Sequence, residues 1–251
     1  MGGMEDSMKQ LRKGSGVVLG LLWLLWGAAL TEGKGPDHFY FTLKMSEDKK
    51  LCPAITEVLA EEYNEHWIQD PPLHEWFVQW EPVRSLGEQF RDEPEFADDS
   101  CSLYRWAQFD LDNDGRPEVV IKWSACLGGI RSDRLYIFRG DAPRSSIYDK
   151  MMHQTKSDQE GLLGELSYTG QWYELKKLPL FKGKRGGMQL HGMGGVVWIH
   201  PFVFGGQTYL NLHDLCCDEG GSAWHVIARY RRDEKKSVQL EEVCYVERRQ
   251  L

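Results

Sequence analysis

An acidic loop between two apolar segments constrains the fold of this chain more than any other feature of its sequence. Residues 109–121 read FDLDNDGRPEVVI, with aspartates at alternate positions, then Gly115 and a further acid. Oxygen ligands in this number suit a hard divalent cation such as Ca²⁺, and the glycine allows the backbone to turn sharply between them. The β-branched residues 119–121 favour a strand over a helix, so the sequence predicts an ion-binding loop between two strands.

The spacing of these acids resembles the calcium loop of the FG-GAP/VCBS type, which occurs in the blades of integrin-like β-propellers. In that family a D-x-D-x-D-G-x-x-D loop leads into an apolar strand, and the loop is repeated along the chain. This chain carries one copy, and Glu118 stands where the family usually has Asp. The resemblance implies a structural Ca²⁺ whose ligands are side-chain oxygens of Asp110, Asp112, Asp114 and Glu118 and the backbone carbonyl of Arg116.

Two other interpretations of the loop are open. An EF-hand requires a glutamate at the last position of its loop, but counting from Asp110 places Ile121 there. An acidic turn without metal is the third interpretation, because Asp-Gly between apolar runs is also a hairpin signal. Carboxylates this close together repel one another unless a cation or solvent intervenes, and this repulsion favours the ion.

The N-terminal segment 1–30 has the organisation of an export signal. A basic segment at 8–13 precedes an apolar run at 17–30, and small residues at 27–29 offer a cleavage site. The sequence therefore predicts a signal peptide and an exported protein, periplasmic or secreted, with no stable membrane span once the signal is cleaved. An uncleaved N-terminal membrane anchor is the alternative, although the apolar run is short for a span.

Six cysteines follow the predicted signal, and an even number in an exported chain indicates disulfides. We expect Cys101 to pair with Cys126 across the acidic loop, and Cys216 or Cys217 to pair with Cys244. A bond between the two adjacent cysteines would be strained. The competing interpretation is a free reactive thiol at one of these two adjacent positions.

The remaining pattern predicts a β-dominated α+β fold. A helix is expected over about residues 53–67, where apolar residues recur at helical spacing after a proline. The aromatic run 74–83 reads as a strand, the acidic loop reads as part of a three-stranded meander, and Gly205-Gly206 reads as a hairpin turn. We expect antiparallel meander or sandwich-like sheets, or partial propeller-like sheets. The helix-containing region, 31–100, and the β-rich region, 101–251, should form one continuous globular unit.

Composition and motifs limit the function. A formal net charge of −8 argues against sequence-independent binding of nucleic acid, which requires a basic face. The sequence contains no nucleophile elbow, zinc-protease helix or dinucleotide-binding fingerprint. It therefore favours a non-enzymatic binding module of the cell envelope or the extracellular space, with a protein or glycan partner that the sequence does not identify.

Two sequence features keep other functions open. His213, Asp214 and Cys217 are close in sequence, so a secreted hydrolase with its site in this region is the alternative function. A loop with a disulfide and surface histidines is the simpler interpretation of the same residues. Three tryptophans are candidates either for an exposed surface that binds a peptide or glycan or for the core. These are Trp67, Trp76 and Trp80.

Overall fold

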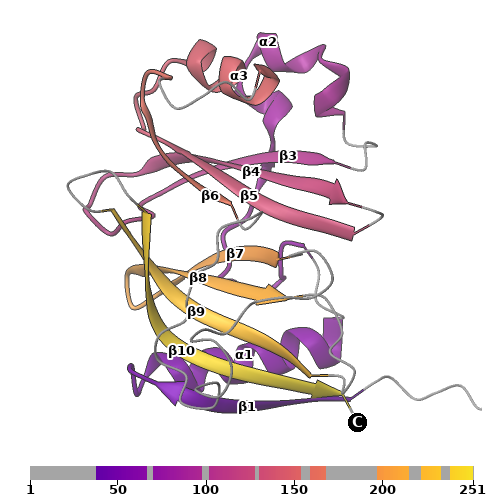
Figure 1. Cartoon of the computed structure of the whole chain (residues 1–251), viewed down its shortest axis with the longest axis vertical. Helices are drawn as coiled ribbons and strands as arrows, with labels where there is room; N and C mark the ends of the chain where they lie inside the picture. Colours follow the sequence, from indigo (N-terminus) through magenta and orange to yellow (C-terminus); the bar gives the residue numbers. More distant parts are fainter. Residues whose placement is uncertain are drawn as a thin grey trace, which may run out of the picture. The chain divides into compact units, whose positions relative to one another are not determined.

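Two antiparallel five-stranded sheets dominate the structure, which is a computed structural model (Figure 1). The strand orders are β1-β10-β9-β8-β7 in sheet A and β2-β3-β4-β5-β6 in sheet B. This arrangement confirms the predicted β-dominated α+β fold with antiparallel sheets. The structure describes residues 38–66, 70–97, 102–127, 130–153, 159–167, 197–214, 222–232 and 238–250. All of them belong to one unit, Asp37–Leu251.

The elements have the following bounds. Sheet A consists of β1 (Phe39–Ser46), β7 (Val197–Phe204), β8 (Gln207–Asp214), β9 (Ser222–Arg232) and β10 (Val238–Gln250). Sheet B consists of β2 (Glu81–Pro82), β3 (Leu103–Phe109), β4 (Glu118–Leu127), β5 (Ile130–Phe138) and β6 (Leu162–Ser167). The helices are α1 (Leu51–His66), α2 (Glu88–Arg91) and α3 (Arg144–His153), with short 3-10 turns η1 (Val83–Leu86) and η2 (Pro94–Phe96).

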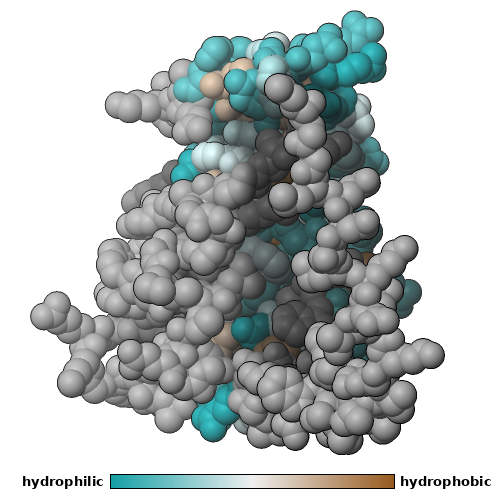
Figure 2. Space-filling model, turned by 90° about the vertical axis from the view of Figure 1, so that its right-hand side faces the viewer, coloured by the Kyte–Doolittle hydropathy of each residue, from teal (hydrophilic) through white to brown (hydrophobic). Residues whose placement is uncertain are grey.

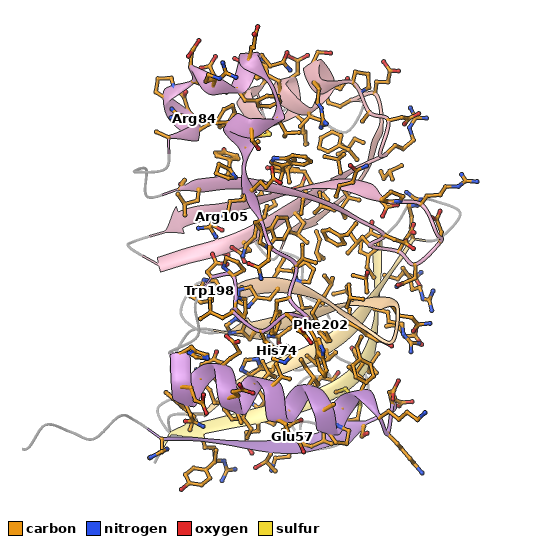
Figure 3. The ribbon with its side chains drawn as sticks, turned by 180° about the vertical axis from the view of Figure 1, so that it is seen from behind. Glu57, His74, Arg84, Arg105, Trp198 and Phe202 are labelled. Atoms are coloured by element: carbon orange, nitrogen blue, oxygen red, sulfur yellow. A yellow bond between two sulfur atoms is a disulfide. The ribbon has the colours of Figure 1, made fainter. Side chains whose placement is uncertain are left out.

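The two sheets pack face to face around a shared apolar core. Val120 and Leu135 of sheet B and Leu210 and Val226 of sheet A belong to this core and are fully buried. Successive side chains of a strand point to opposite faces, so each strand contributes every second residue to the space between the sheets. Figure 3 shows side chains filling that space. The sandwich-like form of the prediction is therefore the one that the structure adopts.

Helices cover the outer face of each sheet, so the layers follow the order helix, sheet A, sheet B, helix (Figure 1). Helix α1 packs on sheet A through a second cluster that includes Ile55, Leu59 and Ile227. Helices α2 and α3 cover sheet B through a third cluster that includes Phe90 and Ile147. The outer surface over α2 and α3 is mostly hydrophilic in the view of Figure 2, as expected for the solvent-facing side of helices packed on a sheet.

Helix α1 confirms the predicted N-terminal helix and begins slightly earlier, at Leu51. Its first turn is capped by Asp48, whose Oδ1 accepts hydrogen bonds from the backbone N–H groups of Leu51 and Lys50, each at 2.9 Å. The bonds from Leu51 and then Lys50 hold the pKa of Asp48 below its usual value. The cap explains why the helix starts before the proline that the sequence pattern marked.

The pairing of Cys244 differs from the prediction. A disulfide joins Cys52 in α1 to Cys244 in β10, across a sequence separation of 192. Cys244 therefore does not pair with Cys216 or Cys217, and that prediction was wrong. The two bonded cysteines meet because α1 packs on sheet A beside β10, so the tertiary fold brings together residues from near the two ends of the described chain.

Several predictions concern residues outside the described part of the chain. These are the export signal at 1–30, the candidate surface residue Trp67, and Cys101, Cys216 and Cys217. The side chain of Cys126 is also outside it, so its bond to Cys101 stays a prediction. Within the described residues, no helix is both long enough and apolar enough to cross a membrane.

The aromatic segment 74–83 was predicted to be a strand, and this prediction was wrong for most of its length. Only its last part, Glu81–Pro82, is a strand, the short β2 of sheet B, and Phe77 forms an isolated bridge to Phe202 of β7. The backbone N–H of Val78 donates to the carbonyl of Pro201 at 2.9 Å, so the segment follows the edge of β7 over a few residues only. The aromatic residues that suggested a strand are used instead to cover this edge and the adjoining core.

The two described tryptophans of the candidate surface pack against the core. Trp76 lies on the cluster beneath α1, with its ring 5.0 Å from that of Phe204. Trp80 lies on the cluster between the sheets, 6.2 Å from the ring of Phe109. Neither is among the exposed large hydrophobic residues, so the core interpretation of these two residues holds.

Candidate metal centre

The acidic loop connects β3 to β4, as the sequence predicts. Phe109 and Glu118 form the last cross-strand pair, which leaves residues 110–117 as the loop. Two loop residues have a positive φ, Asn113 at 62° and Gly115 at 88°. Glycine has no Cβ that would clash in this conformation, and asparagine tolerates it better than most residues. The local sequence therefore allows the tight turn that brings the acids together.

Three of the predicted ligands converge on one point. One carboxylate oxygen from each of Asp110, Asp112 and Glu118 lies within 4.8 Å of the others. Oxygens that bind one Ca²⁺ at about 2.3–2.6 Å can lie at most roughly 5 Å apart, so this spacing fits a single ion. A donor set made of carboxylates suits a hard cation better than a soft one.

A fourth predicted ligand, Asp114, does not join this group. Oδ1 of Asp114 accepts a hydrogen bond from the backbone N–H of Arg116 at 2.8 Å, and Asp114 lies outside the three converging acids. In this structure the side chain of Asp114 therefore affects the converging carboxylates by adding a nearby negative charge. The backbone carbonyl of Arg116 as a ligand stays a prediction.

Hydrogen bonds from backbone N–H groups hold all three converging carboxylates in place, and Asp112 accepts one from Asp114 at 3.2 Å. Asp110 accepts bonds from the N–H of Asp114 at 3.0 Å and from the N–H of Gly115 at 2.9 Å, one to each carboxylate oxygen. Oε2 of Glu118 accepts a bond from the N–H of Leu111 at 2.8 Å. Carboxylate oxygens have more than one lone pair, so these bonds orient the ligands and still leave capacity for an ion.

The loop holds more negative charge than its hydrogen bonds offset. Burial, and then the charges of Asp112 and Asp114, raise the pKa of Glu118 to about 7 although Leu111 opposes the shift. Burial and then Asp114 also raise the pKa of Asp112, although Arg232 opposes this. A divalent cation would remove the repulsion that disfavours the charged carboxylates. The excess negative charge of the loop and the spacing of its carboxylate oxygens therefore both fit Ca²⁺.

Two contacts fasten the loop to sheet A. Nδ2 of Asn113 donates to the carbonyl of Thr208 on β8 at 3.1 Å, and the N–H of Thr208 donates to Oδ1 of Asn113 at 2.6 Å. Nη2 of Arg232 on β9 lies 3.2 Å from Oδ2 of Asp112. The loop belongs to sheet B but is held from sheet A. Sequence reasoning missed Asn113, and its only local signal was an asparagine within an Asp-Gly turn.

A pocket of about 490 Å³ lies beside the loop. Asp114 of the loop and Glu118 at the start of β4 line one part of it, and Arg139, Gly140 and Leu163 line another. A pocket of this size is within the range of sites that hold a small ligand or a side chain of a partner. It places an accessible surface next to the candidate ion.

The alternative site near His213, Asp214 and Cys217 is only partly described. His213 is fully buried, with its Nδ1 3.1 Å from the hydroxyl oxygen of Tyr63. The side chain of Asp214 and all of Cys217 lie outside the described residues. The histidine of the predicted hydrolase site therefore lies in the interior, and the hydrolase stays a prediction.

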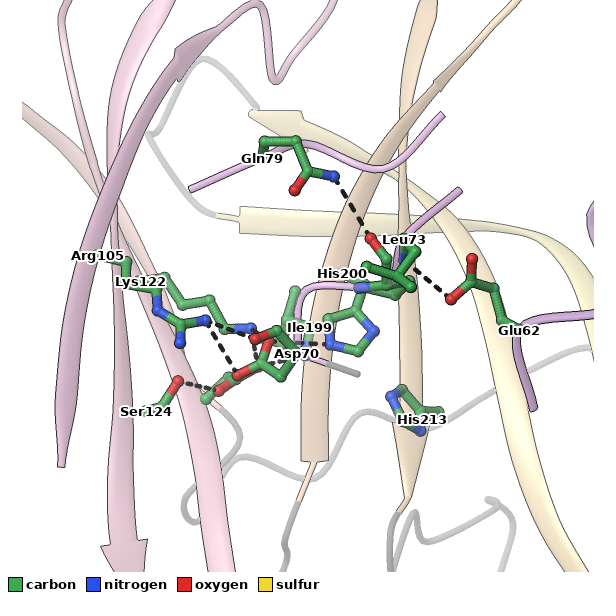
Figure 4. A network of polar contacts seen from close by, with 12 residues as sticks. Glu62, Asp70, Leu73, Gln79, Arg105, Lys122, Ser124, Ile199, His200 and His213 are labelled. Atoms are coloured by element: carbon green, nitrogen blue, oxygen red, sulfur yellow. Dashed lines mark hydrogen bonds and ion pairs between the residues drawn. The ribbon is translucent and has the colours of Figure 1, made fainter. Parts of the chain in front are cut away.

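A buried ionic cluster between the sheets was missed by sequence reasoning (Figure 4). Nζ of Lys122 on β4 lies 2.5 Å from Oδ1 of Asp70 and 2.9 Å from Oδ2 of Asp133. Asp133 also accepts a hydrogen bond from the backbone N–H of Ile199 at 2.8 Å. Nε2 of His200 lies 3.3 Å from Asp70. The cluster joins β4 and β5 of sheet B to β7 of sheet A.

Asp70, Asp133 and His200 have ligand atoms spaced as in a metal site, but Lys122 supplies the cation between them. Burial by itself would raise the pKa of Asp70, but Lys122 and then His200 lower it below its usual range. Burial by itself would lower the pKa of Lys122, but Asp133 and Asp70 raise it above its usual value. The ammonium therefore stays charged, and we interpret the cluster as a structural link.

Comparison of the chain with protein-family models, with curated proteins and with solved structures found no match. The function must therefore be argued from the residues of this chain.

Proposed function

We propose that this chain is an exported, disulfide-stabilised binding module in which the acidic loop holds a structural Ca²⁺. The observation that carries the proposal is the convergence of Asp110, Asp112 and Glu118 within 4.8 Å. The FG-GAP/VCBS resemblance points to the same ion and adds Asp114 and the carbonyl of Arg116 to the ligands.

The ion would act by stabilising the junction between the sheets. Asn113 and Asp112 connect the loop to β8 and β9, so an ion that orders the loop also stabilises these contacts. Each of the converging carboxylates comes from the loop or from the first residue of the next strand, and none comes from the body of a sheet. This placement supports a structural role for the ion and gives no support for a catalytic one.

The pocket beside the loop is the proposed position of the partner. Its lining includes the ion-binding residues Asp114 and Glu118, so loss of the ion would change the shape and charge of the binding surface. The partner is proposed to be a protein or a glycan.

Two features support export. The N-terminal segment has the basic, apolar and small-residue order of a signal peptide. The bond between Cys52 and Cys244 is of a kind that persists in oxidising compartments and is rare in the cytosol. The cell envelope or the extracellular space is the proposed location.

A thermal melt of the protein in EDTA, in Ca²⁺ and in Mg²⁺ tests the ion. An ion present at one hundred times its dissociation constant should add about 2.7 kcal/mol to the free energy of unfolding. For a chain of this size that corresponds to a rise in Tm of roughly 5–10 °C with Ca²⁺. Metal analysis of the same sample shows whether EDTA has removed the ion.

Matched variants locate the ion in the loop. Asp112→Ala should abolish the Ca²⁺-dependent rise in Tm because it removes one of the three converging carboxylates. Arg232→Gln removes the ion pair between Arg232 and Asp112 but leaves the carboxylate in place, so the Ca²⁺-dependent rise in Tm should remain. Asp141→Asn, an exposed acid next to the pocket, should also keep it. A metal-free wild-type protein whose Tm does not respond to Ca²⁺ would refute the proposal.

A further inference from the structure

Two histidines are stacked in the interior between sheet A and α1. His213 of β8 and His225 of β9 are a direct cross-strand pair, and their rings lie 4.8 Å apart at an angle of 8°. Both are completely buried. Two adjacent buried imidazoles are unusual because histidine takes up a proton near neutral pH.

Helix α1 contacts this pair through Tyr63. The hydroxyl of Tyr63 lies 3.1 Å from Nδ1 of His213, and its ring lies edge-on to His225 at 5.4 Å. Nδ1 of His225 lies 3.0 Å from Oδ1 of Asn211. Among the described residues, Nε2 of neither histidine has a hydrogen-bond partner. These contacts fit neutral histidines, because each ring has one hydrogen-bonded nitrogen and no partner for a second N–H among the described residues.

The elements packed around the pair bring positive or neutral groups to it. Arg248 of β10 lies over the Tyr63 ring at 4.3 Å, and Phe41 of β1 lies 5.8 Å from the ring of His225. His200 of β7 lies 5.0 Å from the ring of His213. In the described part of the chain, neither stacked histidine has a carboxylate within ion-pair distance.

The charged groups farther from the histidine pair do not supply a counter-charge for it. Asp70 and Asp133 are already bound to Lys122, which adds a positive charge on the side of His200. Glu62 of α1 is buried, but its carboxylate accepts hydrogen bonds from the backbone of the segment that follows the helix. A proton on either stacked histidine would therefore meet no free counter-charge among the described residues.

These surroundings disfavour the protonated state. Burial, followed by the neighbouring histidines and Arg248, lowers the pKa of His213 well below its usual value. Burial and then Arg248 do the same for the pKa of His225. A histidine with a lowered folded-state pKa contributes stability that is complete above about pH 6.5 and is lost as the pH falls below it.

The two ends of α1 are attached differently. Near its start, Cys52 is covalently bound to β10. Near its end, Tyr63 rests on the histidine pair, and Glu62 accepts hydrogen bonds from the N–H groups of Leu73 and His74. Only the second attachment depends on uncharged histidines.

We propose that His213 and His225 form an acid-sensitive latch, in which protonation of the pair releases the C-terminal half of α1 from sheet A while the disulfide keeps its N-terminal half attached. Release would also loosen the segment from Leu73 onward, which Glu62 holds and which covers the edge of β7. The latch is independent of the acidic loop, which connects β3 to β4 and is held to β8 and β9 rather than to α1.

The size of the effect follows from proton linkage. Each histidine is neutral while the helix is docked and can take up a proton once the helix is released. Below the normal histidine pKa of about 6.5, each one therefore increases the equilibrium constant for release about tenfold per pH unit. For two histidines, the change from about pH 7.5 to about pH 5.0 is roughly a thousandfold. This range lies above the normal titration of carboxylates.

Hydrogen–deuterium exchange of the intact protein at these two pH values tests the latch, after correction for the intrinsic exchange rate. Amide protection over residues 56–66 should fall by about two to three orders of magnitude, as a local opening of this kind predicts, while protection of β5 falls by less than about tenfold. Unchanged protection of 56–66 would overturn the proposal. Equal loss of protection in both segments would also overturn it, because that is global acid unfolding.

Variants separate the latch from a general effect of acid. The double variant H213N/H225N keeps a polar group near each Nδ1 position but cannot be protonated, so its helix should stay protected at about pH 5.0. Arg248→Gln removes a facing positive charge and should move the transition to lower pH, which provides a second test if the double variant does not fold. The control His153→Asn, an exposed histidine of α3, should behave as wild type. Retention of the wild-type transition by the double variant would refute the latch.

Discussion

Replacement of Lys122 by Met tests whether the buried ionic cluster holds the sheets together. The lysine side chain is completely buried, and its ammonium contacts Asp70, which is 8% exposed, and Asp133, which is 0% exposed. Methionine fills a similar volume without the charge. The substitution therefore removes the ammonium that lies between the two buried carboxylates, and among the described residues only Asp70 keeps a second cation, Arg105 at 3.7 Å.

The magnitude follows from the burial. Removing one partner of a buried ion pair costs about 3–5 kcal/mol, because the remaining charge is neither paired nor hydrated. Arg105 still lies 3.7 Å from Asp70, and Asp133 still accepts hydrogen bonds from Ser124 and Ile199, so these contacts place Lys122→Met toward the lower end of that range. With about 2–4 °C per kcal/mol for a chain of this size, the fall in Tm should likewise lie toward the lower end of roughly 6–20 °C.

The assay is urea denaturation and thermal melting of the variant beside a matched control. Lys44→Met removes a lysine of β1 that is 27% exposed and pairs with Glu247, which Arg249 also contacts. Glu247 is buried but keeps Arg249 as a partner after this substitution, so the control should lose less stability than Lys122→Met.

The pH dependence adds a second check. Lys122 lowers the pKa of Asp70 despite its burial, so this acid contributes stability above its unfolded pKa of about 3.9 that is lost only at lower pH. Without the ammonium, the effect of burial, which raises the pKa of Asp70, is opposed less, so Asp70 takes up a proton at a higher pH than in wild type. The difference between wild type and Lys122→Met should therefore narrow with decreasing pH. Equal melting temperatures for Lys122→Met and Lys44→Met at neutral pH would show that the cluster does not hold the sheets.

Three further variants test the contacts that join distant parts of the chain. Asn113→Ala should cost about 2–3 kcal/mol, because it removes both hydrogen bonds to Thr208 and places a Cβ residue at positive φ. Asn113→Gly removes the same bonds without the backbone strain, so it should cost about 1 kcal/mol less in urea denaturation, and equal costs would show that strain plays no part. The double variant C52S/C244S should lose about 2–5 kcal/mol and equal the reduced wild-type protein in Tm. A double variant as stable as the oxidised wild type would show that the bond does not constrain the unfolded chain.

Local patterns in the sequence predicted local structure well. The spacing of apolar residues predicted α1, the paired glycines predicted the turn between β7 and β8, and the alternate aspartates predicted a loop between two strands. Three of the acids in that loop converge in the structure. These predictions succeeded because each depends on neighbours within a few residues, where backbone geometry and side-chain periodicity limit the choices.

The sequence also misled where aromatic content was taken as a sign of a strand. The segment 74–83 contains residues that favour strands, but its aromatic side chains cover an edge of sheet A and the adjoining core. Strand propensity measures how well a residue fits a half-buried surface. A segment that lies over a sheet edge is half-buried in the same way, so it contains the same residue types.

By itself, the sequence determined the acidic loop, the helix, the turns and the β-rich class of this protein. Only the tertiary structure decided that Cys52 binds Cys244, that Lys122 points between the sheets and that His213 stacks on His225. Each of these contacts joins residues of different elements. In a strand, a shift of one residue in register moves every side chain to the other face. The partners of a buried group are therefore selected by the packing of the whole fold, which no short stretch of sequence contains.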